Sequence, residues 1–378
     1  MIRVEEVNDA YELTSYRLLW NSLLPQTRQA TFFQSLDWLS VYWKHFGQDQ
    51  RLRVLIVTSG GRPVGILPLA VRTEPTRVGP VRVLTYPLHD WGTFYGPIGP
   101  NPTATLTAAL RHVRQTPRDW DLLDLRWVDL KCCDRGRTPA AMQRIGFPPR
   151  RQGWNQAPVV DMACGWDEYW NGRPKKWRHN VFRLRRRLAE RGEVAHVRYR
   201  PDGAANGDAD PRWDLFDACV KIGRESWQAS STDGKALCHA TVRDFLRETH
   251  RAASQAGSID LNLLLLDKKP IAFVYNYHYQ GRVCGLRRGF DPQYTAAGPG
   301  TVLQYMMLED GFRREDSCYD MGAGSLDGKR YWQTSLATSY RFTHFPLSIA
   351  RAQLLRIERW FQDRLHGPRY LACATQTA

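Results

Sequence analysis

The stretch from Asp260 to Trp332 constrains the fold of this 378-residue chain more than any other part of the sequence. It begins with two β-like runs, Asp260–Leu266 and Pro270–Tyr279, which are separated by the polar turn Asp-Lys-Lys. A third run, Arg282–Phe290, is rich in glycine and arginine. Apolar runs separated by short polar turns predict a β-hairpin followed by a further strand.

A glycine-rich loop, Ala296–Thr301, follows the third strand and contains Gly298 and Gly300 on either side of a proline. After the loop, apolar residues recur at three-and-four spacing, which predicts an amphipathic helix: Val302, Tyr305, Met306, Leu308 and Phe312. The start of such a helix presents unpaired N–H groups and a positive dipole end, and glycines let an anion come close. We therefore expect a phosphate-binding site at this loop.

Several motifs of this region occur in the order seen in a known family. They are Ile271-Ala272 in the hairpin, Gly298-Pro299-Gly300, Tyr319-Asp320-Met321-Gly322-x-Gly324, and Lys329-x-x-Trp332, with Phe33-Gln34-Ser35-x-x-Trp38 nearer the start. Together they resemble the FemAB/CelD-like acyltransferases of the GNAT superfamily, and the resemblance covers residues 30–346. It implies an α+β (mixed α/β) fold of tandem GNAT-like domains, each a mostly antiparallel sheet flanked by helices.

The first half of the chain contains a shorter version of the same pattern. The hairpin sequence from Leu52 to Leu67 mirrors that from Leu261 to Val274, which indicates an internal duplication. In the first half the loop 96–102 has three prolines, which remove N–H donors that a phosphate would need. We therefore expect residues 1–150 to be a degenerate GNAT-like domain, 151–350 to be the donor-binding GNAT-like domain, and 351–378 to be a helix and tail.

The charge of the chain is strongly positive, with a net charge of +15. Residues 171–200 hold eleven Lys and Arg against two Glu, a net charge of +9. Apolar residues at helical spacing predict one basic helix here that ends at Gly192, followed by a helix from Trp213 to Trp227. Two interpretations remain open for the basic face: it is solvated and binds nothing, or it binds a phosphate-bearing acceptor or the tRNA backbone.

The family resemblance also implies roles for individual residues. Asp320 is the candidate general base or amine-orienting carboxylate, Tyr331 the candidate acid for the leaving thiolate, and Lys329 a charge stabiliser or acceptor ligand. Residues expected to bind the acyl-CoA donor are Arg287, Arg288, Ala297, Gly298, Gly300 and Thr301, and those expected to bind the acceptor are Lys175, Arg178, Trp227 and Tyr275. Simpler structural roles are the alternatives: Asp320 caps a turn before Gly322, and Tyr331 packs beside Trp332.

The predicted function is N-acyl transfer from acetyl-CoA or another acyl-CoA to an amine of a small molecule or an envelope polysaccharide precursor, including phosphorylated or nucleotide-linked ones. Two alternatives remain: an aminoacyl-tRNA-dependent transferase, although the long heptads of the coiled-coil arm in those relatives are missing, and a non-catalytic polyanion-binding scaffold. The eight cysteines lack metal-ligand spacing, so we expect reduced thiols and no metal. No apolar run is long enough for a membrane helix, so we expect a soluble, cytoplasmic protein.

Overall fold

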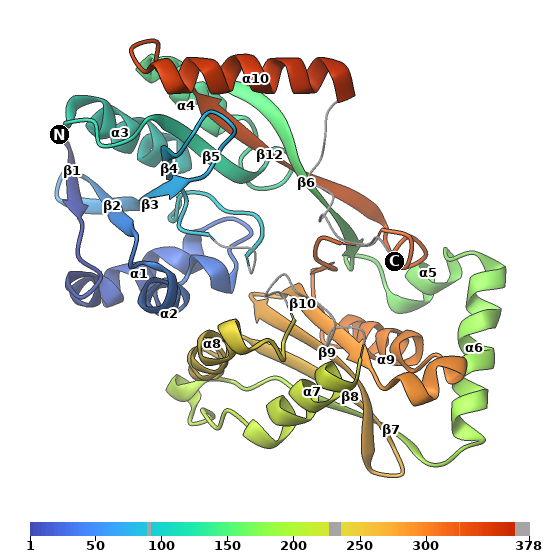
Figure 1. Cartoon of the computed structure of the whole chain (residues 1–378). Coiled ribbons are helices and arrows are strands. Elements are labelled where there is room, and N and C mark those ends of the chain that lie inside the picture. Colours follow the sequence, from blue (N-terminus) through green and yellow to red (C-terminus); the bar gives the residue numbers. More distant parts are fainter. Residues whose placement is uncertain (89–91, 227–235, 325, 367–378) are drawn as a thin grey trace. The chain divides into compact units, whose positions relative to one another are not determined.

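The computed structural model describes residues 1–88, 92–226, 236–324 and 326–366 (Figure 1). The chain forms two compact units. Unit 1 comprises Met1–Gln156 and Ala337–Ala378, and unit 2 comprises Ala157–Leu336. Unit 1 is therefore formed by the two ends of the chain and unit 2 by the segment between them. The domains expected from the sequence were instead consecutive segments. The reason is that the last strand and helix pack with the first part of the chain.

Unit 1 contains a mostly antiparallel sheet with the strand order β1-β2-β3-β4-β5-β12-β6. The strands are β1 (Ile2–Val7), β2 (Gln50–Ser59), β3 (Arg62–Glu74), β4 (Val81–Thr85), β5 (Leu122–Asp129), β12 (Ser335–His344) and β6 (Arg150–Asp161). β4 and β5 are parallel, and β12 runs antiparallel to β5. The helices are α1 (Arg17–Leu23), α2 (Leu36–Phe46), α3 (Pro102–Gln115), α4 (Arg137–Ile145) and α10 (Ala350–His366).

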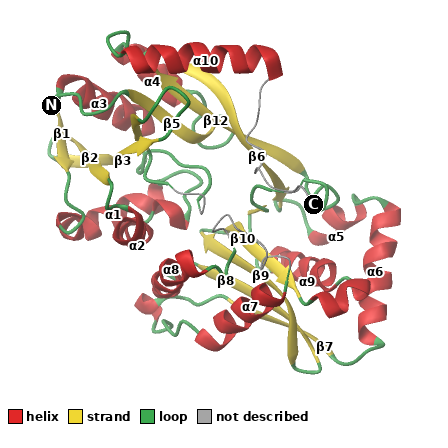
Figure 2. Cartoon of the chain, viewed as in Figure 1, coloured by secondary structure: helices red, strands yellow, loops and turns green. Residues whose placement is uncertain are grey.

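Unit 2 repeats this arrangement with the strand order β6-β11-β10-β9-β8-β7 (Figure 2). Its own strands are β7 (Val194–Tyr199), β8 (Ile259–Leu266), β9 (Lys269–Tyr279), β10 (Arg282–Phe290) and β11 (Cys318–Asp320). The helices are α5 (Trp166–Asn171), α6 (Lys175–Ala189), α7 (Trp213–Glu225), α8 (Arg243–Gln255) and α9 (Pro299–Arg313). The predicted fold class, an α+β fold with mostly antiparallel sheets flanked by helices, is confirmed.

The internal duplication is visible in the topology. β1 to β5 correspond in order and pairing to β7 to β11, and each series ends in a parallel pair, β4 with β5 and β10 with β11. A helix joins the two strands of each pair, α3 in unit 1 and α9 in unit 2. The sixth strands are exchanged, because β5 pairs with β12 from the second half of the sequence and β11 pairs with β6 from the first.

Side chains on the two faces of the unit 2 sheet pack against different helices. Tyr275 of β9 contacts Phe216 of α7 and His250 of α8. The next residue, Asn276, contacts Met307 of α9. Since successive strand residues point to opposite faces, α7 and α8 cover one face of the sheet and α9 covers the other. α6 packs on the α9 side, where Val181, Leu184 and Leu188 join the same apolar core.

One expectation about secondary structure was wrong. The basic helix ends at Ala189, earlier than Gly192, and β7 follows it, because its residues pair with β8 despite their charge. Two other segments differ from what their local sequence indicates. Residues 131–165 are rich in proline and arginine, yet they contain α4 and all of β6. Near the start of the chain, apolar residues at helical spacing form a 3₁₀ turn from Glu12 to Tyr16 followed by the short α1. Tertiary pairing outweighs local pattern in these segments.

Candidate active site

The first turn of α9 is built on a glycine with a left-handed backbone. Gly298 has φ +60°, and a Cβ atom added there would lie 2.8 Å from Leu184 of α6. A side chain at this position would therefore be strained and would also push α6 away. At Gly300, by contrast, an added Cβ would meet only the Phe290 ring, at 3.4 Å. The two glycines thus differ: Gly298 is required by the fold, whereas Gly300 leaves room above the helix start.

The N–H groups of this turn are partly used by the turn itself. The N–H of Gly298 donates to Thr295 O at 3.0 Å, and that of Thr301 donates to Gly298 O at 3.0 Å. Pro299 has no N–H, so Gly300 is the candidate N–H donor among the predicted residues of the loop. Ala297 is fully buried below them. The cradle for an anion is therefore narrower than the sequence suggested.

The basic helix α6 lies beside this turn. Seven of its fifteen residues are Lys or Arg and none is acidic. Arg187 Nη1 donates to Ala296 O at 2.9 Å, and the Arg185 guanidinium lies 4.6 Å from the centre of the Tyr305 ring in α9. Two arginines that the sequence did not single out therefore lie along the first half of α9, Arg187 next to its start and Arg185 against its second turn. The sequence showed the charge run, but the packing decides which of its arginines face the loop.

Other cations of α6 point to solvent. Lys175, Lys176, Arg183 and Arg186 are exposed. Within the described residues the one ion pair that α6 forms joins Arg186 to Glu190, at 3.5 Å with both side chains mostly exposed. Such a pair contributes little to stability. The outer face of α6 is therefore a cationic surface with almost no internal compensation.

The parallel strands β10 and β11 pair over a short length and then separate. Arg282 to Cys284 pair with Cys318 to Asp320, and a β-bulge follows between Gly285 and Arg287. Beyond the pairing with β10 the chain continues along β6, since the N–H of Met321 donates to Pro158 O at 2.9 Å. Gly285 still lies against this chain, because a Cβ atom added to it would lie 3.0 Å from Asp320 O, so the strands separate only beyond Gly285. Arg287 and Arg288 lie on β10 just past it, and both are half-buried.

Asp320 and Lys329 both hold the turn that follows β11. Asp320 is buried, and its Oδ1 accepts from the N–H of Gly322 at 2.9 Å. Lys329 is also buried, and its Nζ donates to Gly322 O at 2.8 Å and Ala323 O at 2.9 Å. Gly322 has φ +71°, which favours glycine. The turn-capping role, weighed as the alternative for Asp320, is the one that these contacts show.

Tyr331 lies at the start of α6. Its ring stacks on Trp177, with centroids 4.8 Å apart, and its hydroxyl accepts from Arg330 at 2.7 Å. Trp332 packs edge-on against the same tryptophan. Of the predicted acceptor residues on α6, Lys175 is exposed, and Arg178 is half-buried and donates to Asn171 Oδ1 at 2.9 Å. α6 therefore spans from Tyr331 at one end to the α9 start at the other.

The other two predicted acceptor residues are not brought to this place. Tyr275 is fully buried on the opposite face of the sheet, under α7 and α8, and its hydroxyl lies 3.1 Å from His250 Nδ1. Burial raises the pKa of Tyr275 well above its usual value. A phenol held in this way is part of the core and does not line a site. Trp227 lies outside the described residues.

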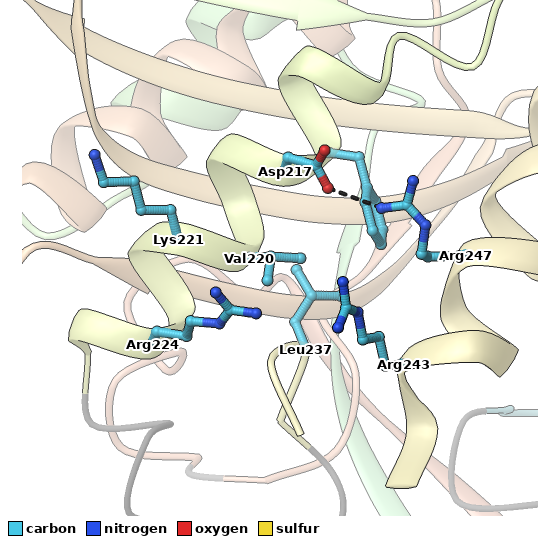
Figure 3. A pocket seen from close by; sticks show the side chains of 8 residues that line it. Asp217, Val220, Lys221, Arg224, Leu237, Arg243 and Arg247 are labelled. Carbon is cyan, nitrogen blue, oxygen red and sulfur yellow. Dashed lines mark hydrogen bonds and ion pairs between the residues drawn. The ribbon is translucent and has the colours of Figure 1, made fainter. Parts of the chain in front are cut away.

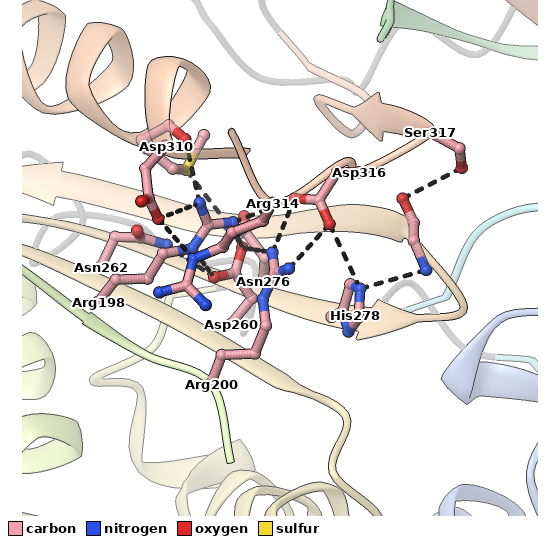
Figure 4. A network of polar contacts seen from close by, with 12 residues as sticks. Arg198, Arg200, Asp260, Asn262, Asn276, His278, Asp310, Arg314, Asp316 and Ser317 are labelled. Atoms are coloured by element: carbon pink, nitrogen blue, oxygen red, sulfur yellow. Dashed lines mark hydrogen bonds and ion pairs between the residues drawn. The ribbon is translucent and has the colours of Figure 1, made fainter. Parts of the chain in front are cut away.

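A buried ion network fixes α9 to the sheet (Figure 4). Arg198 of β7 donates to Asp260 at 2.7 Å and to Asp310 of α9 at 3.0 Å, and Arg200 donates to Asp316 at 2.8 Å. Burial would raise the pKa of Asp260, but Arg198 and Arg200 outweigh it and hold that pKa far below its usual value. The network joins three elements and fixes the far end of the helix whose first turn is the candidate site.

A second concentration of cations lines a cavity of about 490 Å³ between α7 and α8 (Figure 3). Its lining residues are Phe216, Asp217, Val220, Lys221, Arg224, Leu237, Arg243 and Arg247. Arg224 and Arg243 extend toward each other, with Leu237 between them, whereas Lys221 points away. Asp217, the one acid of the lining, accepts from Arg247 at 2.9 Å. The cavity therefore combines apolar side chains with Lys221, Arg224 and Arg243, which form no ion pair with a described residue.

Residues 175–331, which form most of unit 2, match the family described as "Acetyltransferase (GNAT) domain". Unit 2 contains a GNAT-type acetyltransferase domain. The predicted resemblance to the acyltransferases of the GNAT superfamily is thereby confirmed for residues 175–331. The matched residues include the parallel strands β10 and β11. They also include the glycine turn at which α9 begins.

Solved structures show the same fold across both units. FemX superposes with a TM-score of 0.59 at 12% identity, covering 94% of this chain and 99% of FemX. L-PGS from Bacillus licheniformis gives 0.54 at 11% identity, covering 94% and 98%. The C-terminal domain of a protein provisionally named lysylphosphatidylglycerol synthetase, from Agrobacterium fabrum, gives 0.55 at 10% identity, covering 94% and 98%. No curated protein matches the sequence.

Neither a metal-binding cluster nor a membrane-spanning helix is present in the described part of the chain. There the structure holds no cluster of three or more His, Cys, Asp or Glu side chains that could bind a metal ion. None of its described helices is long and apolar enough to cross a bilayer.

Proposed function

We propose that the GNAT domain transfers an acyl group from acyl-CoA to an amine, with the pyrophosphate of coenzyme A bound at the start of α9. The observation that carries this proposal is the turn at Gly298 and Gly300, flanked by Arg185 and Arg187 of α6. The positive end of a helix dipole, a glycine without a side chain and two arginines together favour a diphosphate. Arg288 on β10 adds a cation on the path from the pyrophosphate to the thioester.

In this proposal the reaction takes place where β10 and β11 separate. The acceptor nitrogen attacks the thioester carbon, the C–N bond forms and the C–S bond breaks. A backbone N–H of β10 beyond the bulge stabilises the oxyanion. Asp320 orients the amine and receives its proton, and Tyr331 supplies a proton to the departing thiolate. Lys329 holds the 322–324 turn in place, which makes it a positioning residue.

The acceptor is proposed to be an amine that also bears phosphate, either a phosphorylated or a nucleotide-linked small molecule. Support comes from the cavity between α7 and α8, where Arg224 and Arg243 form no ion pair with a described residue. Arg243 is the first residue of α8, where the helix dipole disfavours a positive charge unless an anion is present. The cavity lies on the face of the sheet opposite α9, so donor and acceptor would approach the separated strands from opposite sides.

A second candidate donor is aminoacyl-tRNA. The observation that favours it is the exposed cationic face of α6, formed by Lys175, Lys176, Arg183 and Arg186. Uncompensated charges along a helix suit a nucleic-acid backbone. The two donors differ in where they depend on the protein: coenzyme A needs the α9 turn, whereas tRNA needs the outer face of α6.

A calorimetric titration with coenzyme A and acetyl-CoA tests the proposal. We expect micromolar binding to the wild type and a loss of at least about 100-fold in Gly300→Glu, because the carboxylate would occupy the anion site and repel it. Thr103→Glu is the matched control, since Thr103 occupies the same second position in α3 of unit 1 and is exposed. Equal affinity in Gly300→Glu and wild type would rule out the α9 site, and binding only of aminoacyl-tRNA would favour the second donor.

The acceptor site has a separate test, which uses pyrophosphate as the probe in the presence of saturating coenzyme A. The double variant Arg224→Ala, Arg243→Ala should bind pyrophosphate at least about tenfold more weakly, because two charge-assisted contacts are lost. Arg251→Ala removes an exposed arginine from the same helix, outside the cavity lining, and should have no effect. Unchanged pyrophosphate affinity in the double variant would exclude the cavity, whatever the outcome for coenzyme A.

A further inference from the structure

Helix α10 exposes a continuous apolar stripe. Leu354, Ile357, Phe361 and Leu365 are between 53% and 75% exposed. They follow one another at spacings of three and four residues, so they lie on one face of the helix. Leu347 just before the helix is 83% exposed and Trp360 is 43% exposed. Six of the twelve large apolar side chains that the described structure exposes therefore lie within this short segment.

The stripe is not the face that attaches α10 to unit 1. That face carries Ala352 and Leu355, which are buried against Val83, Leu122 and Phe345. A single exposed leucine is ordinary, but a contiguous apolar stripe along about three turns of a helix is typical of an interaction surface. α10 is thus apolar on two sides, and unit 1 covers one of them.

Charges around the stripe indicate what covers the other side. Arg351, Arg356 and Arg364 are exposed, and the Arg364 guanidinium lies 4.1 Å from the centre of the Trp360 ring. The two acids of the helix are engaged elsewhere: Glu358 lies 3.6 Å from Arg77, and Asp363 lies 2.6 Å from Arg150. The surface beside the stripe therefore presents cations, on a chain whose net charge is already +15.

We propose that α10 binds the surface of an anionic phospholipid membrane, with the apolar stripe inserted at the boundary between headgroups and acyl chains. Leucine, isoleucine, phenylalanine and tryptophan on one side of a helix, with arginines along its edges, are the pattern of helices that lie in the membrane interface. Arginine side chains at the edges reach the lipid phosphates while their stems stay on the apolar side. The inference is independent of the donor and of the acceptor that the GNAT domain uses.

Co-sedimentation of the full-length protein with vesicles tests this surface. We use phosphatidylcholine vesicles with and without one quarter phosphatidylglycerol, and compare wild type with the double variant Ile357→Ser, Phe361→Ser. Partitioning onto the anionic vesicles should fall at least about tenfold in the variant, because two apolar side chains no longer enter the interface. Leu18→Ser is the matched control: Leu18 is 85% exposed in α1, away from α10, and its loss should change binding less than twofold.

Two further arms complete the experiment. Arg351→Gln with Arg364→Gln should lower binding to anionic vesicles several-fold and weaken its dependence on salt, since each arginine near the surface adds electrostatic attraction. Static light scattering measures the alternative occupant, a second copy of the chain. A wild-type dimer that becomes monomeric in the Ile357→Ser, Phe361→Ser variant would overturn the proposal, as would anionic vesicle binding that this variant retains. Circular dichroism establishes that each variant is folded.

Discussion

The starts of α3 in unit 1 and α9 in unit 2 occupy equivalent places in the repeat, but only one of them is open. In unit 1 the preceding loop folds back on the sheet: Ile98 forms an antiparallel bridge with Ile66, with both hydrogen bonds at 2.8 Å. The N–H of Gly99 donates to Thr27 Oγ1 at 2.7 Å. In unit 2 the corresponding chain is a short 3₁₀ turn that leaves Gly300 uncovered by any close backbone.

The separation of the parallel strands differs in the same way. In unit 1 the N–H of Tyr95 donates to Trp127 O at 3.0 Å, so the loop continues the hydrogen bonding of β5. Phe94 packs on the Trp127 ring beside it. In unit 2 the chain after Asp320 continues its pairing with β6, whereas the pairing with β10 ends and the β10 bulge follows. The two units therefore share the same strand order. In unit 1 the loop backbone fills the position at which unit 2 is proposed to hold a ligand.

The largest expected effect comes from breaking a buried ion network in each unit. Asp260→Ala removes the fully buried carboxylate that Arg198 and Arg200 share, and these arginines keep their ion pairs with Asp310 and Asp316. Asp124→Ala in unit 1 removes the carboxylate shared by Arg126 and Arg341, of which Arg126 keeps its pair with Glu74. Each change should lower the free energy of unfolding by about 3–5 kcal/mol, because a buried guanidinium charge loses part of its compensation. Chemical denaturation measures it.

The two variants should differ in donor binding. Asp260→Ala loosens the anchor of α9 and should weaken coenzyme A binding, whereas Asp124→Ala should leave it unchanged at a temperature where both variants are folded. Equal loss of coenzyme A affinity in both would remove the functional distinction between the units.

The next effect is a dependence of stability on pH, which we expect to differ between the units because each contains a different buried histidine. His250 is fully buried, its Nε2 lies 2.6 Å from Pro211 O, and burial lowers its pKa to about 4. The pKa of His250 in the folded state lies below its unfolded value near 6.5, so folding favours the neutral ring. The stabilisation that this ring contributes is complete above pH 6.5 and is lost as the pH falls toward 4. Unit 2 should therefore lose about 3 kcal/mol over this window.

His250→Gln tests this origin. The variant should be less stable than wild type at pH 7.5 but should show a smaller loss between pH 6.5 and 4, as followed by thermal unfolding at each pH. In unit 1 burial also lowers the pKa of His344, whose ring is partly accessible, and His344→Gln is the matched comparison. An unchanged pH slope in His250→Gln would assign the acid sensitivity to other groups.

The smallest effect concerns the start of one helix in each unit. Ser35 caps α2 in unit 1, where its Oγ accepts from the N–H of Trp38 at 3.1 Å. In unit 2, α7 starts at Arg212 with φ +46° and no side-chain cap. Ser35→Ala should cost about 1 kcal/mol, since one N–H loses its partner. Arg212→Gly should stabilise unit 2 slightly, because glycine tolerates this backbone. A destabilised Arg212→Gly would show that its ion pair with Asp214 matters more than the strain.

Most of the strands and helices could be predicted from the sequence because their signals are local. The hairpins with polar turns, the apolar spacing after Gly298 and the cap at Ser35 all act within a few residues. β6 and β7 were missed because their partners, β11 and β8, are distant in the sequence. In the sequence, the charged residues in and just after β7 continue the pattern of the basic helix. The structure shows instead that Arg198 and Arg200 pair with buried aspartates.

The candidate site was predictable in its place but not in its details. The glycine loop and the following helix indicated an anion site, and the structure keeps both together. Sequence spacing could not show that the N–H groups of Gly298 and Thr301 donate hydrogen bonds inside the turn. It also could not show that Arg185 and Arg187 are the arginines beside it. Tyr275 illustrates the opposite case: one step along β9 changes the face of the sheet, and the side chain belongs to the core under α7 and α8.

The exchange of β6 and β12 has a consequence for how the protein is made. β5 ends at Asp129, but its partner β12 begins only at Ser335, about 200 residues later. At typical ribosome speeds this interval lasts roughly 10–40 s. During that time β5 is an unpaired sheet edge on a nascent chain, which is the kind of surface that pairs with the wrong partner. Slowed translation of the second half should therefore lower the yield of folded protein, because unit 1 has to wait for β12 and α10 to complete its sheet and core.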